Sequence, residues 1–199
     1  MTEQLTAERI LDTAEDVLRR YGPAKATVVD VARALGVSHG SVYRHFGTKA
    51  ALREAVAERW LRRTSAPLAA LADDPALPAP ERLRGWVRAL NATKRDYALQ
   101  DPELQRTFRE LVGDATGIVT AHEDELAGQL ARIVAAGVAA GQFTAADPAV
   151  AGRAVFQATA RFHHPAHAAD WTAPANDADL DAVVDLLLAG LAPRRPADC

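Results

Sequence analysis

A short stretch near the N-terminus, residues 27–49, constrains the fold of this chain more than any other; it reads TVVDVARALGVSHGSVYRHFGTK. It predicts a helix, a tight turn at Gly36, a second short helix from Ser38 to Phe46 and the start of a third. The second helix carries Ser, His, Tyr and Arg where a buried helix would carry Leu. A short polar helix held by a rigid partner is suited to enter the major groove of DNA, so the stretch indicates a helix-turn-helix module.

The polar side chains of this stretch provide groups that DNA can accept. Apolar residues are spaced to fill one small core and leave the polar ones pointing outward. Arg44 can donate two hydrogen bonds to a guanine edge, and Ser or His can bond bases or phosphates. Lys49 suits a phosphate, as do the free N–H groups at a helix N-terminus, where Thr27 stands. The predicted DNA-binding residues are Thr27, Ser38, His39, Gly40, Ser41, Tyr43, Arg44, His45 and Lys49.

The stretch resembles the TetR family of bacterial transcriptional regulators over about residues 6–60. The resemblance is carried by Thr27, Val31-Ala32, Gly36-Val37-Ser38, Val42-Tyr43-Arg44-His45-Phe46, Lys49 and Leu52. It implies an all-helical homodimer whose N-terminal three-helix domain binds an operator and whose larger C-terminal domain binds a small inducer. It also implies phosphate contacts by Thr27, Tyr43, His45 and Lys49, and a base-reading face of Ser38, His39, Ser41 and Arg44. The alternative is a helical hairpin whose polar residues are only solvated.

The rest of the chain also reads as helix, because Pro, Gly and Asp mark the joints and no stretch alternates with period two. Expected N-caps are Thr6, Thr27 (with Asp30 in a capping box), Ser38 and Thr48. We expect helices at roughly 7–22, 27–35, 38–46, 49–71, 80–99, 102–112, 114–140, 147–163 and 177–191. The predicted fold is all-α, with a helix-turn-helix DNA-binding domain at 1–48 joined to a larger helical ligand-binding and dimerisation domain at 49–199.

Composition and charge bound the possible partners. Of the 199 residues, 49% are hydrophobic and 25% charged, and no stretch approaches the roughly 20 apolar residues of a membrane span. The polar start and the single Cys199 favour a cytoplasmic protein with no membrane partner. Net charge is −3, yet residues 1–63 hold 11 Lys and Arg against 8 Asp and Glu. This positive excess is small, so DNA affinity would depend on placement and on a second copy.

The last helix is the best candidate for a dimer interface, because its apolar stripe is too broad for one partner. The preceding helix offers small residues that permit close approach. The predicted interface residues are Val155, Phe162, Leu180, Val184, Leu187 and Leu188. The alternative is a helix within the core of a single chain.

Histidines gather near the end of the penultimate helix, where His163, His164 and His167 flank Pro165. Together with a histidine from a facing helix they could hold Zn²⁺ or Ni²⁺, or line an effector pocket. The predicted ligands of such a metal or effector are His122, His163 and His167. The alternative is that these histidines cap the helix end and bond neighbouring carbonyls.

These features predict a ligand-responsive regulator without a certain cofactor. The family resemblance implies a repressor that binds a palindromic operator in double-stranded DNA and is released by an effector. A metal-sensing regulator of the same fold is the first alternative. A metal-dependent enzyme is the second, and it is disfavoured because the chain lacks Gly-x-Ser-x-Gly, His-Glu-x-x-His, a phosphate loop and a nucleophilic cysteine.

Overall fold

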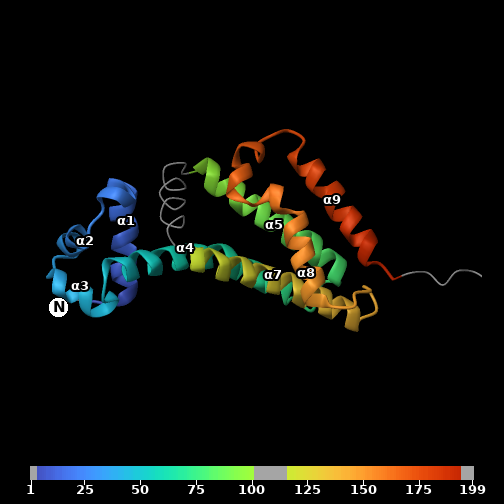
Figure 1. Cartoon of the computed structure of the whole chain (residues 1–199), viewed down its shortest axis with the longest axis horizontal. Helices are drawn as coiled ribbons and strands as arrows, with labels where there is room; N and C mark the ends of the chain where they lie inside the picture. Colours follow the sequence, from blue (N-terminus) through green and yellow to red (C-terminus); the bar gives the residue numbers. More distant parts are fainter. Residues whose placement is uncertain (1–3, 101–115, 194–199) are drawn as a thin grey trace, which may run out of the picture. The chain divides into compact units, whose positions relative to one another are not determined.

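The computed structural model describes residues 4–100 and 116–193, and in these residues it contains helices and no strand. The α-helices, shown in Figure 1, are α1 (Ala7–Lys25), α2 (Val28–Leu35), α3 (His39–Phe46), α4 (Lys49–Ala72), α5 (Ala79–Gln100), α7 (Thr116–Ala139), α8 (Pro148–Ala158) and α9 (Asn176–Leu191). Two 3₁₀ turns, η1 (Ala160–Phe162) and η2 (Pro165–Asp170), lie between α8 and α9. The all-α prediction is confirmed, while the predicted helix at 102–112 lies outside the described residues. None of the described helices is both long and apolar enough to cross a membrane.

Polar side chains begin the N-terminal helices where the sequence predicts them. Thr27 and Asp30 form a complete capping box: the Thr27 hydroxyl accepts the Asp30 N–H at 3.2 Å, and the Asp30 carboxylate accepts the Thr27 N–H at 3.1 Å. Single hydroxyl caps, which accept a main-chain N–H at 3.0–3.2 Å, are formed by Thr6, Ser38 and Thr48. These bonds satisfy N–H groups that the first turn of a helix leaves without a partner.

Helix ends follow from local geometry in two places and depart from expectation in a third. Gly36 has φ 68°, a left-handed conformation that glycine adopts without strain, and it makes the turn between α2 and α3. Gly22 has φ 74° and breaks the helical geometry of α1, which agrees with the predicted end there. The single helix expected at 147–163 is wrong, because α8 ends at Ala158. The Thr159 hydroxyl donates to the last carbonyls of α8, and the chain continues as η1.

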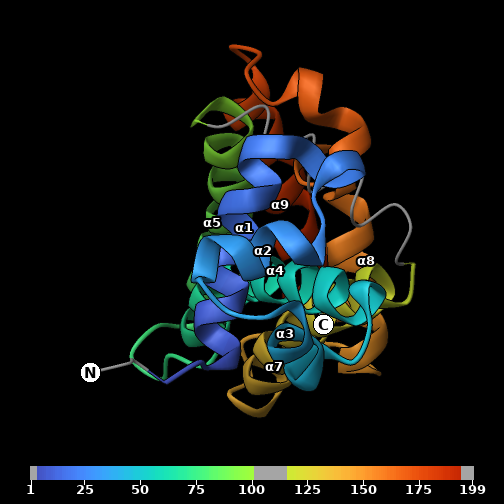
Figure 2. The same ribbon diagram turned by 90° about the vertical axis from the view of Figure 1, so that its left-hand side faces the viewer.

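The described chain divides into two compact units, and α4 and α7 contribute residues to both. The first unit contains residues 4–62 and 116–120. Within it α2 packs against both α1 and α3 (Figure 2), and one apolar core joins them to the start of α4. That core is formed by buried residues such as Ile10, Ala14, Leu18, Val31, Val42, Leu52, Val56 and Trp60. Val42 is the only fully buried residue of α3, and Phe46 packs half-buried against the same core, so most of the other side chains of this helix stay accessible.

The second unit contains residues 63–100 and 121–193. Its core joins the end of α4 to α5, α7, α8 and α9, and its largest fully buried side chains include Leu68, Leu83, Trp86, Leu90, Leu126, Leu130, Ile133 and Leu180. Helix α8 crosses α7 at Gly152, where a Cβ atom would lie 2.4 Å from the main-chain nitrogen of Ala131. Only glycine permits this separation, so α8 is held against α7 backbone to backbone.

A ladder of ion pairs joins α5 and α9, which run side by side in opposite directions in Figure 1. The pairs are Arg84–Asp185, Arg88–Asp181 and Arg95–Asp177. Arg88 binds Asp181 in a two-pronged arrangement, with both N–H···O distances at 2.7 Å. Exposed pairs of this kind contribute little stability each, but they fix the register of α9 along α5.

Candidate DNA interface and interior histidine site

Helix α3 exposes the side chains that the sequence predicts to read DNA. Ser38, His39, Gly40, Tyr43, Arg44 and His45 are exposed, and Ser41 is half-buried. A helix of eight residues with a single buried side chain contributes little to a core. The arrangement leaves almost the whole surface of α3 available for a groove of DNA.

A chain of hydrogen bonds orders the face of α3 that is predicted to read bases. The Ser38 and Ser41 hydroxyls are 2.9 Å apart, and the Arg44 guanidinium donates to the Ser41 hydroxyl at 3.1 Å. A guanidinium has five N–H donors, so this bond aims Arg44 and leaves other donors for a base edge. The rings of His39 and Tyr43, which lie one helical turn apart on α3, meet edge to face with their centroids 6.5 Å apart. The face is thus partly ordered before DNA arrives, which lowers the entropy cost of binding.

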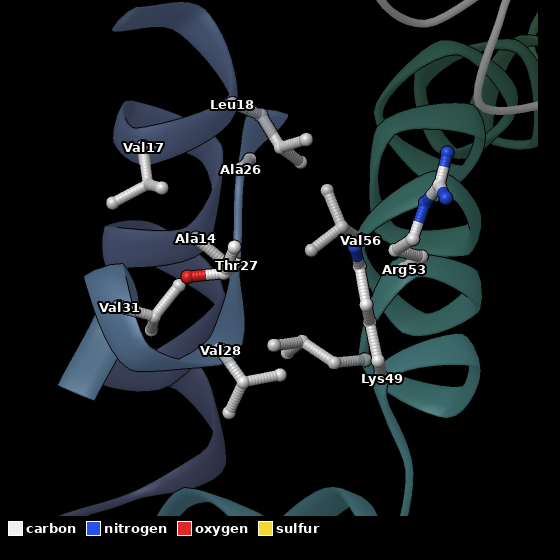
Figure 3. A pocket seen from close by; sticks show the side chains of 11 residues that line it. Ala14, Val17, Leu18, Ala26, Thr27, Val28, Val31, Lys49, Arg53 and Val56 are labelled. Carbon is white, nitrogen blue, oxygen red and sulfur yellow. The ribbon is translucent and has the colours of Figure 1, made fainter. Parts of the chain in front are cut away.

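The two predicted phosphate contacts outside α3 line a common hollow. Thr27 and Lys49 border a narrow hollow of about 20 Å³ between α1, α2 and α4, and Arg53 joins them. Figure 3 shows Thr27 on one side and both cationic residues on α4, on the other. Arg53 escaped the sequence reasoning, although its spacing of four residues from Lys49 puts both on one helix face.

The capping box changes how the Thr27 end of α2 meets a phosphate. The hydroxyl and N–H of Thr27 both donate to the Asp30 carboxylate, at 2.5 and 3.1 Å. These bonds hold the pKa of the Asp30 carboxyl below its usual value, so a negative charge stands at this helix end. Because Thr27 lies beside this negative charge, we expect a phosphate bound here to depend on the positive charges of Lys49 and Arg53.

The predicted metal or effector histidines are separated by their environments. His122 on α7 and His163 after η1 are buried, whereas His167 on η2 is exposed. Among the described residues no group of three or more His, Cys, Asp or Glu side chains is placed to hold a metal ion. The contacts of two histidines agree with the alternative that they bond neighbouring main-chain groups. The His163 Nε2 lies 3.1 Å from the Phe156 carbonyl oxygen, and the His164 Nδ1 accepts the Ala166 N–H at 3.2 Å.

Burial sets the ionisation of the interior histidines. Burial, assisted by the Lys94 ammonium, lowers the pKa of His122 to about 3. Burial also lowers the pKa of His163 to about 4, although its hydrogen bond to Phe156 acts in the opposite direction. Both rings are therefore neutral at pH 7. The Nε2 of His122 is buried and has no hydrogen-bond partner in the part of the chain that the structure describes, which is an unusual state for a ring nitrogen.

Lys94 on α5 is the interior residue that sequence reasoning missed. It is 8% exposed, and burial lowers its pKa to about 8, with Glu123 acting in the opposite direction. Its charge acts on both His122 and His163, so the three side chains form one group in the second unit. The available signal was helical spacing, because Lys94 continues the buried stripe of α5 formed by Leu83, Trp86, Val87, Leu90 and Asn91.

The predicted dimer residues lie within one chain. Val155, Phe162, Leu180 and Val184 are 0–3% exposed in the core of the second unit, and Leu187 and Leu188 pack against the same core. The first four residues leave no surface for a second subunit, which corrects the predicted set. The large apolar side chains that α8 and α9 do expose are Val150 (66%) and Leu186 (74%).

Comparison with known proteins matches both units. Residues 10–56 match the model of bacterial regulatory proteins of the tetR family, and residues 79–184 match that of the tetracyclin repressor-like C-terminal domain. An uncharacterized HTH-type transcriptional regulator of Mycobacterium tuberculosis is 32% identical over 96 residues, 48% of each chain. A regulator encoded in the dhlA 5′ region of Xanthobacter autotrophicus is 31% identical over 122 residues, 61% of this chain and 59% of the relative. The chain thus spans about half the length of the curated relatives it matches.

Solved structures share the fold over nearly the whole chain. A protein of unknown function from Rhodococcus sp. RHA1 has a TM-score of 0.70 at 24% identity, covering 96% of this chain and 97% of that one. SmeT bound to triclosan has a TM-score of 0.66 at 22% identity, covering 98% and 100%. At these identities the similarity concerns the fold alone. Because family models match the DNA-binding and the C-terminal segments in one chain, this protein belongs to the TetR family of DNA-binding transcriptional regulators.

Proposed function

We propose that this protein is a repressor that binds a palindromic operator as a homodimer and is released when an effector binds its second unit. The observation that carries the proposal is the α3 surface, where Val42 alone is fully buried and Arg44 is aimed by Ser41. An ordered, accessible polar helix of this kind is suited to read bases in the major groove. The family and fold are those of regulators, which are not enzymes.

Relatives support the repressing role and the response to a ligand. An HTH-type transcriptional repressor of Mycobacterium tuberculosis is 46% identical to this chain over 50 residues, 25% of this chain. SmeT is the repressor of a multidrug efflux pump of Stenotrophomonas maltophilia, and it has been solved with triclosan bound. We extend the repressor role of those proteins, and the binding of a small molecule by SmeT, to this one.

We assign DNA binding to residues 1–48 and regulation with dimerisation to residues 49–199. The core beneath α2 and α3 also uses Leu52, Val56 and Trp60 from the first turns of α4. A fragment that ends at residue 48 would expose this core, so DNA binding requires the beginning of α4 as well. For dimerisation, the exposed Val150 and Leu186 provide apolar area on α8 and α9. A palindromic operator has two half-sites, so it is bound by two DNA-binding domains related by two-fold symmetry.

Selection from a random pool of DNA duplexes tests the proposal. The purified chain is expected to enrich an inverted repeat, and light scattering of the complex is expected to give two protein chains for each duplex. Arg44→Ala, which leaves the core intact, is the control and should lose the enrichment. Failure of the wild-type chain to enrich any sequence, or a stoichiometry of one chain to one duplex, would contradict the proposed function.

A further inference from the structure

The second unit buries a lysine and two histidines, Lys94, His122 and His163, in its interior. We infer that the interior around Lys94 and His122 binds the acidic group of a small organic acid, such as a carboxylate. This inference rests on the proposed function, because it names the chemical class of the effector. Three features of the described residues carry it, namely the unsatisfied nitrogen of His122, the buried cation of Lys94 and the fixed wall around His163.

His122 has a buried ring nitrogen that is available for a hydrogen bond to a ligand. The ring is 9% exposed, and among the described residues its Nε2 has no hydrogen-bond partner. A buried polar atom without a partner costs free energy, and native proteins keep very few. Because the neutral ring carries one N–H, the tautomer with hydrogen on Nε2 can donate to an incoming oxygen atom.

Lys94 supplies the charge. A lysine ammonium is almost never fully buried unless it is compensated, and an apolar residue at this position of α5 would pack at lower cost. Glu123 on α7, which is half-buried, offsets part of the charge. The ammonium depresses the ionisation of both neighbouring histidines, so the interior of the group is electropositive toward any ligand.

The wall around His163 is fixed and mostly apolar. The His163 ring stacks on Phe156 with centroids 4.5 Å apart, and its Nε2 is occupied by the Phe156 carbonyl. Asn91, one turn before Lys94, donates to the Phe162 carbonyl oxygen at 2.7 Å and holds the turn that carries His163. His163 is therefore a positioning residue whose Nε2 is already engaged, whereas His122 keeps a nitrogen for the ligand.

Charge and hydrogen-bond capacity together select the ligand class. An anionic oxygen can accept from the Lys94 ammonium and from the His122 Nε2, and such charge-assisted bonds are the strong ones in a buried site. A ligand amine would place a second cation beside Lys94, and a metal ion would meet the same repulsion. The phenyl rings of Phe156 and Phe162, both buried in this core, suit an acid with an apolar or aromatic body.

Matched acids and amides test the inference on the full-length protein. Benzoate, phenylacetate and indole-3-acetate, each paired with its neutral amide, are titrated by calorimetry. At least one acid is expected to bind saturably and about tenfold more tightly than its amide, as one extra charge-assisted bond would give. Lys94→Met and His122→Phe should each remove most of that preference. Arg153→Met, which removes an exposed cation elsewhere in the unit, should leave it unchanged.

Several results would overturn the inference. Equal binding of acids and amides, absence of saturable binding by every acid, or an acid preference that survives in Lys94→Met would each do so. If Lys94→Met does not fold, the same comparison in His122→Phe decides the question. Operator binding by the wild type is measured separately. Its absence would refute the proposed function, whereas operator binding without acid binding would refute only this inference.

Discussion

The side-chain amide of Asn91 on α5 donates a 2.7 Å hydrogen bond to the main-chain oxygen of Phe162, at the end of η1. The Oδ1 atom of the same side chain accepts a hydrogen bond from Asn176, the first residue of α9, at 3.2 Å. Asn91 and Asn176 are both buried, so water does not replace these bonds when they are broken. One side chain of α5 therefore holds the turn before His163 and the start of α9.

Asn91→Ala is expected to cost about 2–4 kcal/mol of unfolding free energy, because it removes the Asn91 bond to the buried Phe162 carbonyl and leaves the buried Asn176 amide with only its bond to Asp177. Arg88→Ala, three residues earlier on α5, breaks a two-pronged pair with Asp181 that is exposed to solvent. We expect that change to cost at most about 1 kcal/mol. Urea unfolding followed by circular dichroism compares the two variants. Equal losses would show that the buried amide network contributes no more than the surface ladder.

Two helix-interior glycines of the second unit give opposite predictions for the same substitution. Gly152→Ala places a Cβ atom 2.4 Å from the Ala131 nitrogen, so α8 must move away from α7. We expect it to destabilise the protein by about 1–3 kcal/mol or more, as overpacking does. A Cβ atom added at Gly128 on α7 would meet nothing within 4 Å, and Gly128→Ala should stabilise by about 0.5–1 kcal/mol through helix propensity alone.

Thermal unfolding measured side by side checks the glycine pair. The melting temperature should fall for Gly152→Ala and rise for Gly128→Ala. A fall of similar size in both variants would mean that helix crossing does not decide the effect, and would refute the close α7–α8 approach.

Acid should destabilise the fold in a window set by the buried histidines. The pKa of His122 is about 3 and that of His163 about 4 in the folded chain, against an ordinary 6.5. Below pH 6.5 these two histidines bind protons in the unfolded chain but stay neutral in the folded chain. The free energy of unfolding therefore falls as the pH drops from about 6.5 toward 4. Each histidine should contribute a slope of about 1.4 kcal/mol per pH unit within that window.

His122→Gln tests this pH dependence, because glutamine cannot take up a proton. Urea unfolding is measured at pH 7, 6 and 5. The free energy of unfolding of the variant should fall less steeply with decreasing pH than that of the wild type, by about 1.4 kcal/mol per pH unit. His39→Gln, on the exposed surface of α3, controls for the loss of a histidine as such. A wild-type slope in His122→Gln would mean that this ring takes up its proton without unfolding.

Substitution of two cationic residues of the first unit should change DNA binding in different ways. Arg44→Ala is expected to relax sequence preference, because we predict that its guanidinium, which Ser41 holds in place, contacts base edges. Lys49→Ala should weaken binding to all DNA alike and lower the slope of log affinity against log salt by about one. Fluorescence anisotropy on specific and scrambled duplexes, at several salt concentrations, separates the outcomes. A uniform loss for Arg44→Ala on every duplex would remove it from the base-reading set.

Much of the first unit could be predicted from the sequence, because its determinants are local. The Thr27–Asp30 capping box, the left-handed Gly36 and the Ser38 cap each depend on residues within a few positions of one another. The single buried Val42 among polar neighbours follows from helical spacing. Arg53 was not among the predicted residues, since its position across the hollow from Thr27 depends on how α4 packs against α2.

The sequence by itself determined an all-helical chain with a helix-turn-helix near its start, since caps, turns and periodicity act over single turns. Only the tertiary structure decided the interior of the second unit. Lys94, His122 and His163 come from three distant segments. Helical spacing includes Lys94 in the buried stripe of α5, but only long-range packing brings the three side chains together. For the same reason Val155 and Val184 could be read as an interface, although the core of one chain covers them. Periodicity identifies an apolar face, but the partner of that face is chosen by residues far away in the chain.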